Sequence, residues 1–426
     1  MSAFASYSKR LRFGERSAHG ENKGPPLIRP DKHYRPDPTR AVYVQGDFNQ
    51  ALLDKLTPQI IRLQAKGRDP ITVFIDSRGG STQIGGMLQQ LLAAPDQDNS
   101  PICHIITVAT GRAASSAADL LSFGDYAVAY PHARVFYHGV RFTPDDPLTL
   151  ERASAFAESL RWRNDLFAMG LAKRSVRRFM FRYAISKRKF EEFRNRTNQR
   201  TLNDLECFLG ILRENLSQAA AGTIVRAEKR YRRYDDLVSR VLAKSERRKR
   251  FQNAKRPADF EEVVLKEVIS AVARRNPAHD WTFQGAGLSQ LSDDFLLLLE
   301  YMACYDSDDL QVVCDRWANF FLTKSEQGEI TAIQDDDQKR TRRLEILKPR
   351  LRPAWLFFVA LCHSLQEGEE NDLTSLDACW LGLIDEVIGT DYPESLRSFV
   401  EWEPDPEPEP ATVPELPPSG GLAAQA

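Results

Sequence analysis

The chain has 426 residues, of which 42% are hydrophobic and 27% are charged. This composition is ordinary for a globular protein and excludes collagen-like, mucin-like and wholly disordered chains, while the length favours roughly two or three domains. The formal net charge of −1 hides an asymmetry, because residues 161–260 contain 27 Lys and Arg against 11 Asp and Glu, a net +16 that leaves −17 elsewhere. So uneven a division of charge indicates a specialised basic segment.

The six cysteines are scattered through the sequence. They form no CxxC pair and no His/Cys cluster with zinc spacing, which favours free thiols in a reducing compartment. The N-terminus lacks the apolar segment of a signal peptide, and no apolar run approaches the ~20 residues needed to span a bilayer. We therefore expect a cytoplasmic protein with no membrane partner, and the sequence suggests neither a metal site nor a cofactor.

Both ends of the chain differ from its middle. Residues 1–40 are rich in Pro, Gly, Arg and Lys and predict a flexible basic arm. Residues 391–426 are rich in Pro and Glu and then in small residues. Such a segment cannot bury enough apolar surface to offset the entropy of ordering, so we expect a disordered tail.

Between residues 41 and 137, short β-branched runs alternate with stretches of helical spacing. The predicted strands cover residues 41–44, 71–75, 102–108, 126–130 and 134–137, and the predicted helices cover 50–64, 84–93 and 113–123. Strands that alternate with helices of this length imply βαβ crossovers and a mostly parallel sheet, so the expected fold class is α/β.

Residues 148–350 carry mainly helical patterns. The expected helices cover residues 150–171, 187–193, 204–220, 259–275, 292–306 and 309–323. After a further helical run from residue 354, the segment Gly382-Leu-Ile-Asp385-Glu-Val-Ile388 completes the ordered part.

Two loops that follow predicted strands could carry chemistry. Residues 76–81 (DSRGGS) contain a Gly pair that lets the backbone turn sharply, and residues 111–116 (GRAASS) open a helix with small residues. Ser115 would lie near that helix N-terminus, where unpaired N–H groups favour negative charge, as in an anionic tetrahedral intermediate. Alternatively, the Gly pair is an ordinary βα turn and Ser115 an N-cap.

His138 strengthens the catalytic interpretation. It directly follows the predicted strand 134–137. A serine hydroxyl is a weak nucleophile unless a base takes its proton, and an imidazole, whose ordinary pKa lies near neutrality, is suited to that task. Alone, a His at the end of a strand is more often a hydrogen-bonding surface or core residue.

The order of these motifs resembles the proteolytic subunit of the Clp protease. The resemblance covers DSRGGS (76–81), GRAASS (111–116), Gly124 and PHARVFYH (131–138), and the ending LTSLDACWLGLID (373–385) resembles the last helix and strand of that fold. It implies a ClpP/crotonase-like spiral core of ββα type. The core would comprise residues 41–172 and 354–390, with a mostly α-helical domain inserted at 173–353.

The resemblance also implies roles for individual residues. Ser115 matches the nucleophile and His138 the general base of a serine endopeptidase, and Gly79 and Ser116 match the residues whose N–H groups form the oxyanion hole. The third member of the triad is an Asp in that family, and counting back from Gly382 places Glu370 there. Glu367, Glu369 and Asp372 are rival carboxylates.

The resemblance further implies partners. A polypeptide would be the substrate, a homo-oligomer would assemble through the helix at 150–171, and an ATP-dependent unfoldase is a possible partner. The sequence departs from the family at position 78, where Arg stands in place of the usual Pro, and in the large insertion, which places the assembly and the unfoldase partnership in question.

The basic part of the insertion, residues 173–256, mixes Arg and Lys with Phe and Tyr. Such a segment could bind a nucleic acid by following its phosphates and stacking its bases. The simpler interpretation is a set of solvated helix faces, and no named nucleic-acid-binding motif is present.

Three other functions compete with the peptidase hypothesis. The fold could be a catalytically inactive scaffold or binding module whose basic helices bind a partner or nucleic acid. A crotonase-like acyl-CoA enzyme would use similar oxyanion loops but would not need both Ser115 and His138. A Ser-Lys peptidase like signal peptide peptidase A fits less well, because His138 is present and no membrane anchor is evident.

Overall fold

We describe the fold from a computed structural model. The structure describes residues 36–97, 101–141, 149–242, 320–367 and 370–388. The strands are β1 Ala41–Phe48, β2 Ile71–Gly80, β3 Ile105–Ala114, β4 Tyr126–Ala129, β5 Arg134–Tyr137, β6 Asn371–Thr374 and β7 Glu386–Val387. The helices are α2 Gln50–Lys66, α3 Thr82–Leu92, α4 Ser116–Phe123, α5 Leu150–Ser186, α6 Phe190–Arg196, α7 Asp204–Asn215, α8 Gln218–Leu242, α13 Lys324–Ala332, α14 Asp336–Leu365 and α15 Ser375–Trp380, with 3₁₀ turns at η1 Pro38–Arg40 and η2 Lys187–Lys189.

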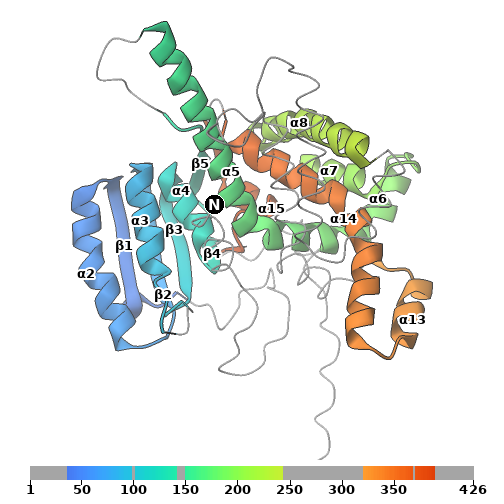
Figure 1. The fold of residues 1–426 in the computed structure, drawn as a ribbon, viewed down its shortest axis with the longest axis horizontal. Coiled ribbons are helices and arrows are strands. Elements are labelled where there is room, and N and C mark those ends of the chain that lie inside the picture. Colours follow the sequence, from blue (N-terminus) through green and yellow to red (C-terminus); the bar gives the residue numbers. More distant parts are fainter. Residues whose placement is uncertain (1–35, 98–100, 142–148, 243–319, 368–369, 389–426) are drawn as a thin grey trace, which may run out of the picture.

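The sheet is built on parallel strands in the order β1-β2-β3-β4-β7. The far end of β3 diverges from β4 and pairs with β5, which pairs in turn with β6 in the antiparallel sense. The α/β prediction is therefore confirmed. The last two strands come from a part of the chain more than 200 residues beyond β5, so the sheet joins two distant segments of the sequence (Figure 1).

The first helices form where the sequence combines caps with an apolar face. In α2, the side chain of Asn49 accepts a hydrogen bond from the N–H of Leu52, which satisfies one of the free donors of the first turn. Five hydrophobic side chains of this helix at helical spacing are buried: Leu52, Leu53, Leu56, Ile60 and Leu63. This face covers the sheet beside β1 and leaves the opposite face in solvent (Figure 1).

Strand β3 is longer at its carboxyl end than the sequence predicts. The pattern predicts a helix that begins at residue 113, but β3 continues to Ala114, and α4 begins at Ser116. Ala113 and Ala114 pair with Val135 and Phe136 of β5, and this pairing holds them extended. Ser115 consequently lies at the junction between strand and helix.

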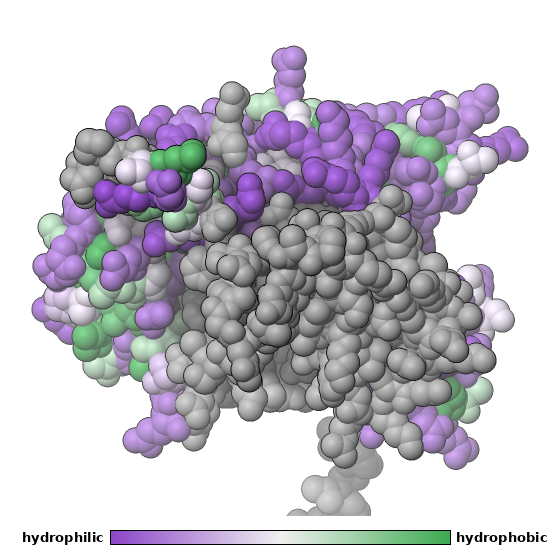
Figure 2. Space-filling view, turned by 45° about the horizontal axis from the view of Figure 1, so that its top comes forward, coloured by the Kyte–Doolittle hydropathy of each residue, from purple (hydrophilic) through white to green (hydrophobic). Residues whose placement is uncertain are grey.

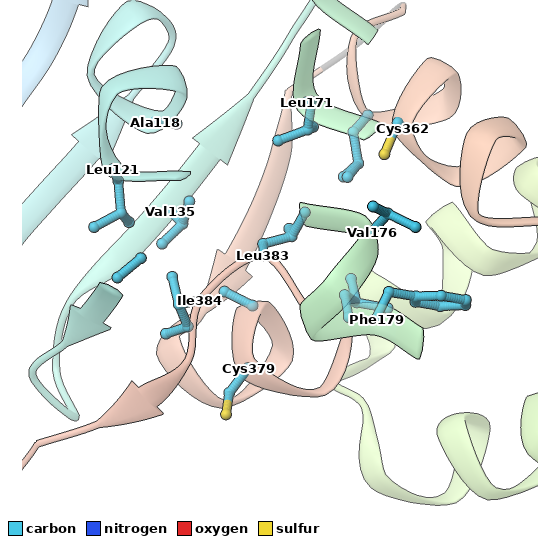
Figure 3. Packing of buried hydrophobic residues seen from close by; sticks show 14 of the residues in the cluster. Ala118, Leu121, Val135, Leu171, Val176, Phe179, Cys362, Cys379, Leu383 and Ile384 are labelled. Atoms are coloured by element: carbon cyan, nitrogen blue, oxygen red, sulfur yellow. The ribbon is translucent and has the colours of Figure 1, made fainter. Parts of the chain in front are cut away.

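Two predicted domain boundaries fall within continuous helices. Helix α5 runs through residue 173 to Ser186, and α14 begins at Asp336 and runs through residue 353. The two helices pack against each other, and both contribute to the main hydrophobic core (Figure 3). The predicted helix 204–220 is two helices instead, because the N–H and hydroxyl of Ser217 bind the carboxylate of Asp377 between α7 and α8. The predicted helices between residues 259 and 306 lie outside the described residues, as does most of the one predicted at 309–323.

Two buried arginines of α5 hold the C-terminal segment in place. Arg178 donates to the carboxylate of Asp385 at 2.8 Å and to the carbonyl of Gly124 at 2.6 Å. Arg182 donates to the carbonyls of Cys379 (2.8 Å) and Asp385 (2.9 Å). The carboxylate of Asp385 also accepts from the N–H of Ala127 in β4. Asp385 therefore links the second half of α5 to the sheet.

Candidate active site

Ser115 occupies a strained turn between β3 and α4. Its φ of 56° and ψ of −127° lie in a region that residues with a side chain rarely adopt. Its N–H donates to the carbonyl of Phe136 at 2.9 Å, and its carbonyl accepts from Ala118 in the first turn of α4. Its half-buried hydroxyl makes no hydrogen bond to any described residue. Serine nucleophiles in α/β hydrolases sit on a similar sharp strand-to-helix turn.

Gly79 lies directly against this turn. It has a φ of +86°, and a Cβ at this position would come within 2.3 Å of the carbonyl oxygen of Ala114 and 3.1 Å of the backbone N of Ser116. Only glycine fits such a close approach. Ser116 is the first residue of α4, so its N–H has no partner within the helix, and no hydrogen bond from it to the described part of the chain is found.

The structure thus brings together both predicted oxyanion donors, but only one of them is unoccupied. The N–H of Gly79 donates to Ser77 Oγ at 3.0 Å, and Ser77 Oγ donates to the carbonyl of Gly46 at 2.5 Å. The Ser116 N–H therefore has no partner in the described part of the chain, whereas the Gly79 N–H is already bonded to Ser77. Sequence reasoning did not anticipate this role of Ser77.

His138 follows β5 at the same edge of the sheet. Since Ala114 pairs with Phe136, Ser115 and His138 both lie just beyond the carboxyl ends of neighbouring parallel strands. Nδ1 of the half-buried imidazole lies 2.6 Å from the carbonyl oxygen of Gly139. A carbonyl only accepts, so this bond assigns the proton to Nδ1 and leaves Nε2 as the basic nitrogen.

The predicted carboxylates that the structure describes have partners other than the imidazole. β6 runs antiparallel to β5 with Asn371 opposite Tyr137, so Glu370 is one residue beyond the paired positions, on the side of His138. Its exposed carboxylate, however, accepts from Arg141 at 3.0 Å. Asp372 pairs with Arg134 and Glu367 with Arg230, and Glu369 lies outside the described residues. No hydrogen bond joins any described carboxylate to His138.

Several polar side chains form hydrogen bonds in and near the loop that contains His138. Asn164 of α5 accepts from the N–H of Val140 at 2.6 Å, and the side chain of Asn371 donates to the carbonyls of Tyr137 and Leu365. Deeper still, Gln366 donates to the carboxylate of Asp119 at 3.1 Å. Sequence analysis missed these residues, because each is a single polar side chain far from the motifs that it supports.

Two of the buried groups below the site have shifted pKa values. Burial raises the pKa of Asp119 to about 6, although the charge of Arg174 and the hydrogen bond from Gln366 act in the opposite direction. Burial, with the nearby charge of Asp119, also raises the pKa of the Tyr137 phenol. The carboxyl of Asp119 is therefore less acidic than an exposed one.

The basic segment at the start of the predicted insertion is mostly internal. The side chains of Arg178, Phe179, Arg182 and Tyr183 are buried, so this stretch forms core and cannot follow a phosphate backbone as the sequence suggests. Further along, Arg194 pairs with Asp204, Arg196 with Glu214 and Arg213 with Glu228.

Hydrophilic side chains cover the upper part of the face in Figure 2, and hydrophobic ones gather at its left side, where Figure 1 places α2 and β1. The remaining basic cluster, residues 247–256, lies outside the described residues.

The family model described as Clp protease matches residues 35–142. This segment of the chain is ClpP-like. The match contains Gly79, Ser115, Ser116 and His138, and it stops well before β6 and β7, which complete the sheet. No curated protein matches the chain. The matched segment agrees with a peptidase of the ClpP kind. No helix in the described part of the chain is long and apolar enough to cross a bilayer.

Proposed function

We propose that the protein is a serine-type endopeptidase that cleaves polypeptides with Ser115 as the nucleophile and His138 as the general base. The observation that carries this proposal is the backbone of Ser115. A serine at φ 56° costs free energy, on the order of 1–3 kcal/mol. The surrounding structure maintains this strain beside the first N–H of a helix, which is the arrangement typical of a serine nucleophile next to an oxyanion site.

The imidazole is oriented by a backbone carbonyl in this proposal. With the Nδ1 proton on the carbonyl of Gly139, Nε2 takes the proton of Ser115 as the hydroxyl attacks the peptide carbonyl, and it then gives that proton to the leaving amine. A neutral carbonyl orients the ring but stabilises the imidazolium less than a carboxylate does. The expected enzyme is therefore slower than one with a complete triad.

The oxyanion that forms in this attack would receive hydrogen bonds from two N–H groups. That of Ser116 is available, and that of Gly79 becomes available when it exchanges Ser77 Oγ for the substrate oxygen. Each such donor is worth about 3 kcal/mol in the transition state.

The proposal can be tested by labelling with a serine-directed fluorophosphonate and by assaying hydrolysis of a fluorogenic peptide library. We expect the wild type to be labelled once per chain, Ser115→Ala not to be labelled, and His138→Gln to be labelled much more slowly. Ser154→Ala, which changes an exposed serine of α5, is the matched control and should behave as the wild type. Equal labelling of Ser115→Ala and the control would overturn the assignment.

A second candidate function is a ClpP-fold scaffold without catalysis. Two observations favour it: the pairing of Glu370 with Arg141, and the bond between the Gly79 N–H and Ser77. A crystal structure with a peptide boronate or fluorophosphonate distinguishes the two functions. A covalent adduct on Ser115 with the oxyanion against Ser116 supports the peptidase, and absence of an adduct at saturating reagent supports the scaffold.

The Clp protease match also suggests how the protein assembles and how it is regulated. We infer that the helices between η2 and α14 are additions to the peptidase core, that α5 contributes to a homo-oligomer in the cytoplasm, and that an unfoldase delivers folded substrates. Analytical ultracentrifugation of the full chain tests the oligomer, and degradation of a folded reporter with and without an added unfoldase tests the delivery.

A further inference from the structure

A cluster of potential metal ligands lies between α5 and the end of α14. It consists of Asp165 on α5, His363 in the last turn of α14, and Glu367 just beyond that helix. The side chains of Asp165 and His363 are each only 4% exposed, and that of Glu367 is one third exposed. The three residues span some 200 positions of sequence, which is why no spacing motif predicts them.

The donor atoms of the cluster lie close together, and those of His363 and Asp165 have the separation that one cation requires. All three ligand atoms lie within 4.8 Å of one another, and His363 Nδ1 is 3.4 Å from Asp165 Oδ1. Metal–ligand bonds of about 2.1 Å at tetrahedral angles place neighbouring ligand atoms roughly 3.4 Å apart. The His–Asp separation therefore suits two ligands of one ion better than a strong direct hydrogen bond, which would be shorter.

The burial of these groups adds a second argument. A carboxylate removed from water costs free energy unless a positive charge compensates it. Glu367 already contacts one cation, the guanidinium of Arg230 on α8. Arg230 would therefore compete with a metal for this carboxylate.

We propose that Asp165, His363 and Glu367 bind a single divalent transition-metal ion, with Zn²⁺ as the best match. Imidazole and carboxylate groups both bind Zn²⁺, and the imidazole distinguishes this set from the all-oxygen sets that Ca²⁺ and Mg²⁺ prefer. Water would supply the fourth ligand. The residues adjoining two of the ligands, Asn164 and Gln366, both lie against the backbone at residues 139–140. The ion would accordingly fasten α5 to α14 directly behind His138.

The test uses the full chain, stripped of metal with a chelator and titrated with Zn²⁺ by calorimetry. We expect one high-affinity ion per chain and a higher midpoint of thermal unfolding with zinc. Asp165→Asn and Glu367→Gln, which keep the side-chain shape, should each weaken binding at least ten-fold. Arg230→Gln should strengthen it, because the competing guanidinium is gone.

Two controls separate this site from adventitious binding. Nδ1 of His104 lies 3.3 Å from Oδ2 of Asp125 in a second His–Asp pair outside the cluster. His104→Ala should therefore leave the high-affinity binding of zinc unchanged. Co²⁺ in place of Zn²⁺ should lack the intense near-ultraviolet band of thiolate ligation. Failure of the wild type to bind zinc, unchanged affinity in Asp165→Asn and Glu367→Gln, or a thiolate band would each refute the proposal, and none of these readouts depends on peptidase activity.

Discussion

The N–H of Ser115 donates to the carbonyl oxygen of Phe136 at 2.9 Å, two residues before His138. This one bond joins the turn that carries the proposed nucleophile to the strand that carries the proposed base. The distance between hydroxyl and imidazole is thereby governed by strand register, which is a more rigid constraint than loop conformation would be.

Ser115 and His138 are expected to act as a unit. We predict that Ser115→Ala and His138→Ala each reduce kcat by about three orders of magnitude or more, and that the double variant loses no further activity, because either change already removes the proton-transfer pathway. Steady-state hydrolysis of one fluorogenic peptide by the four proteins checks this. Losses that multiply in the double variant would mean that the two residues act independently.

Glu370 is expected to contribute little to catalysis. Its carboxylate is 58% exposed and pairs with Arg141, while the carbonyl of Gly139 holds the imidazole. We predict that Glu370→Gln retains kcat/KM within about three-fold, whereas loss of an orienting triad carboxylate costs about 10⁴-fold.

Arg141→Gln is the matched comparison for Glu370→Gln. It releases the Glu370 carboxylate from its partner, and we expect it also to leave kcat/KM nearly unchanged. A large loss in Glu370→Gln together with a gain in Arg141→Gln would instead identify Glu370 as a third catalytic member that Arg141 restrains.

The buried pair of Arg178 and Asp385 should be essential to stability. Both side chains are 6% exposed, and removal of the guanidinium leaves a buried carboxylate without its charge partner. We predict that Arg178→Met lowers the free energy of unfolding by about 3–5 kcal/mol. Arg342→Met, which breaks the exposed pair with Glu329, should cost less than about 1 kcal/mol. Urea denaturation monitored by circular dichroism measures both, and similar losses in the two variants would contradict the prediction.

Asp119 should make the stability depend on pH. Below about pH 4 this carboxyl is protonated in both the folded and the unfolded chain, so its ionisation does not change the free energy of unfolding. Between about pH 4 and pH 6 the unfolded chain releases its proton while the folded one keeps it, because the folded pKa is raised to about 6. The wild type should therefore lose up to about 3 kcal/mol relative to Asp119→Asn as the pH rises from 4 to 7.

Chemical denaturation of the wild type and Asp119→Asn at pH 4, 5, 6 and 7 checks this dependence. Other titrating groups contribute equally to the two proteins and cancel in the difference. A difference that stays constant, or one that grows in favour of the wild type with pH, would show that Asp119 is not destabilised by burial.

The sequence predicts the elements around Ser115 and His138 well, because β-branched runs, caps and glycine turns act over a few residues. Helix α2 and strands β4 and β5 match their predicted ranges to within two residues. Counting back from Gly382 also assigns Glu370 to the third triad position, yet it cannot predict that the side chain pairs with Arg141.

What the sequence could not predict depends on contacts between distant segments. The charge of residues 173–183 predicts a solvated surface, but three of its arginines, at positions 174, 178 and 182, are neutralised or hydrogen-bonded inside the fold. The Asp165–His363–Glu367 cluster and the bond from Gly79 to Ser77 depend on tertiary geometry in the same way.

Strands β6 and β7 reach the sheet only after more than 200 intervening residues. During synthesis, β1 to β5 emerge from the ribosome long before the polypeptide can supply the neighbours of β4 and β5. The nascent chain must carry two unpaired strand edges throughout that interval, a situation that invites aggregation and slows folding. A nascent chain in this state would depend on chaperones more than a protein whose sheet is contiguous in sequence.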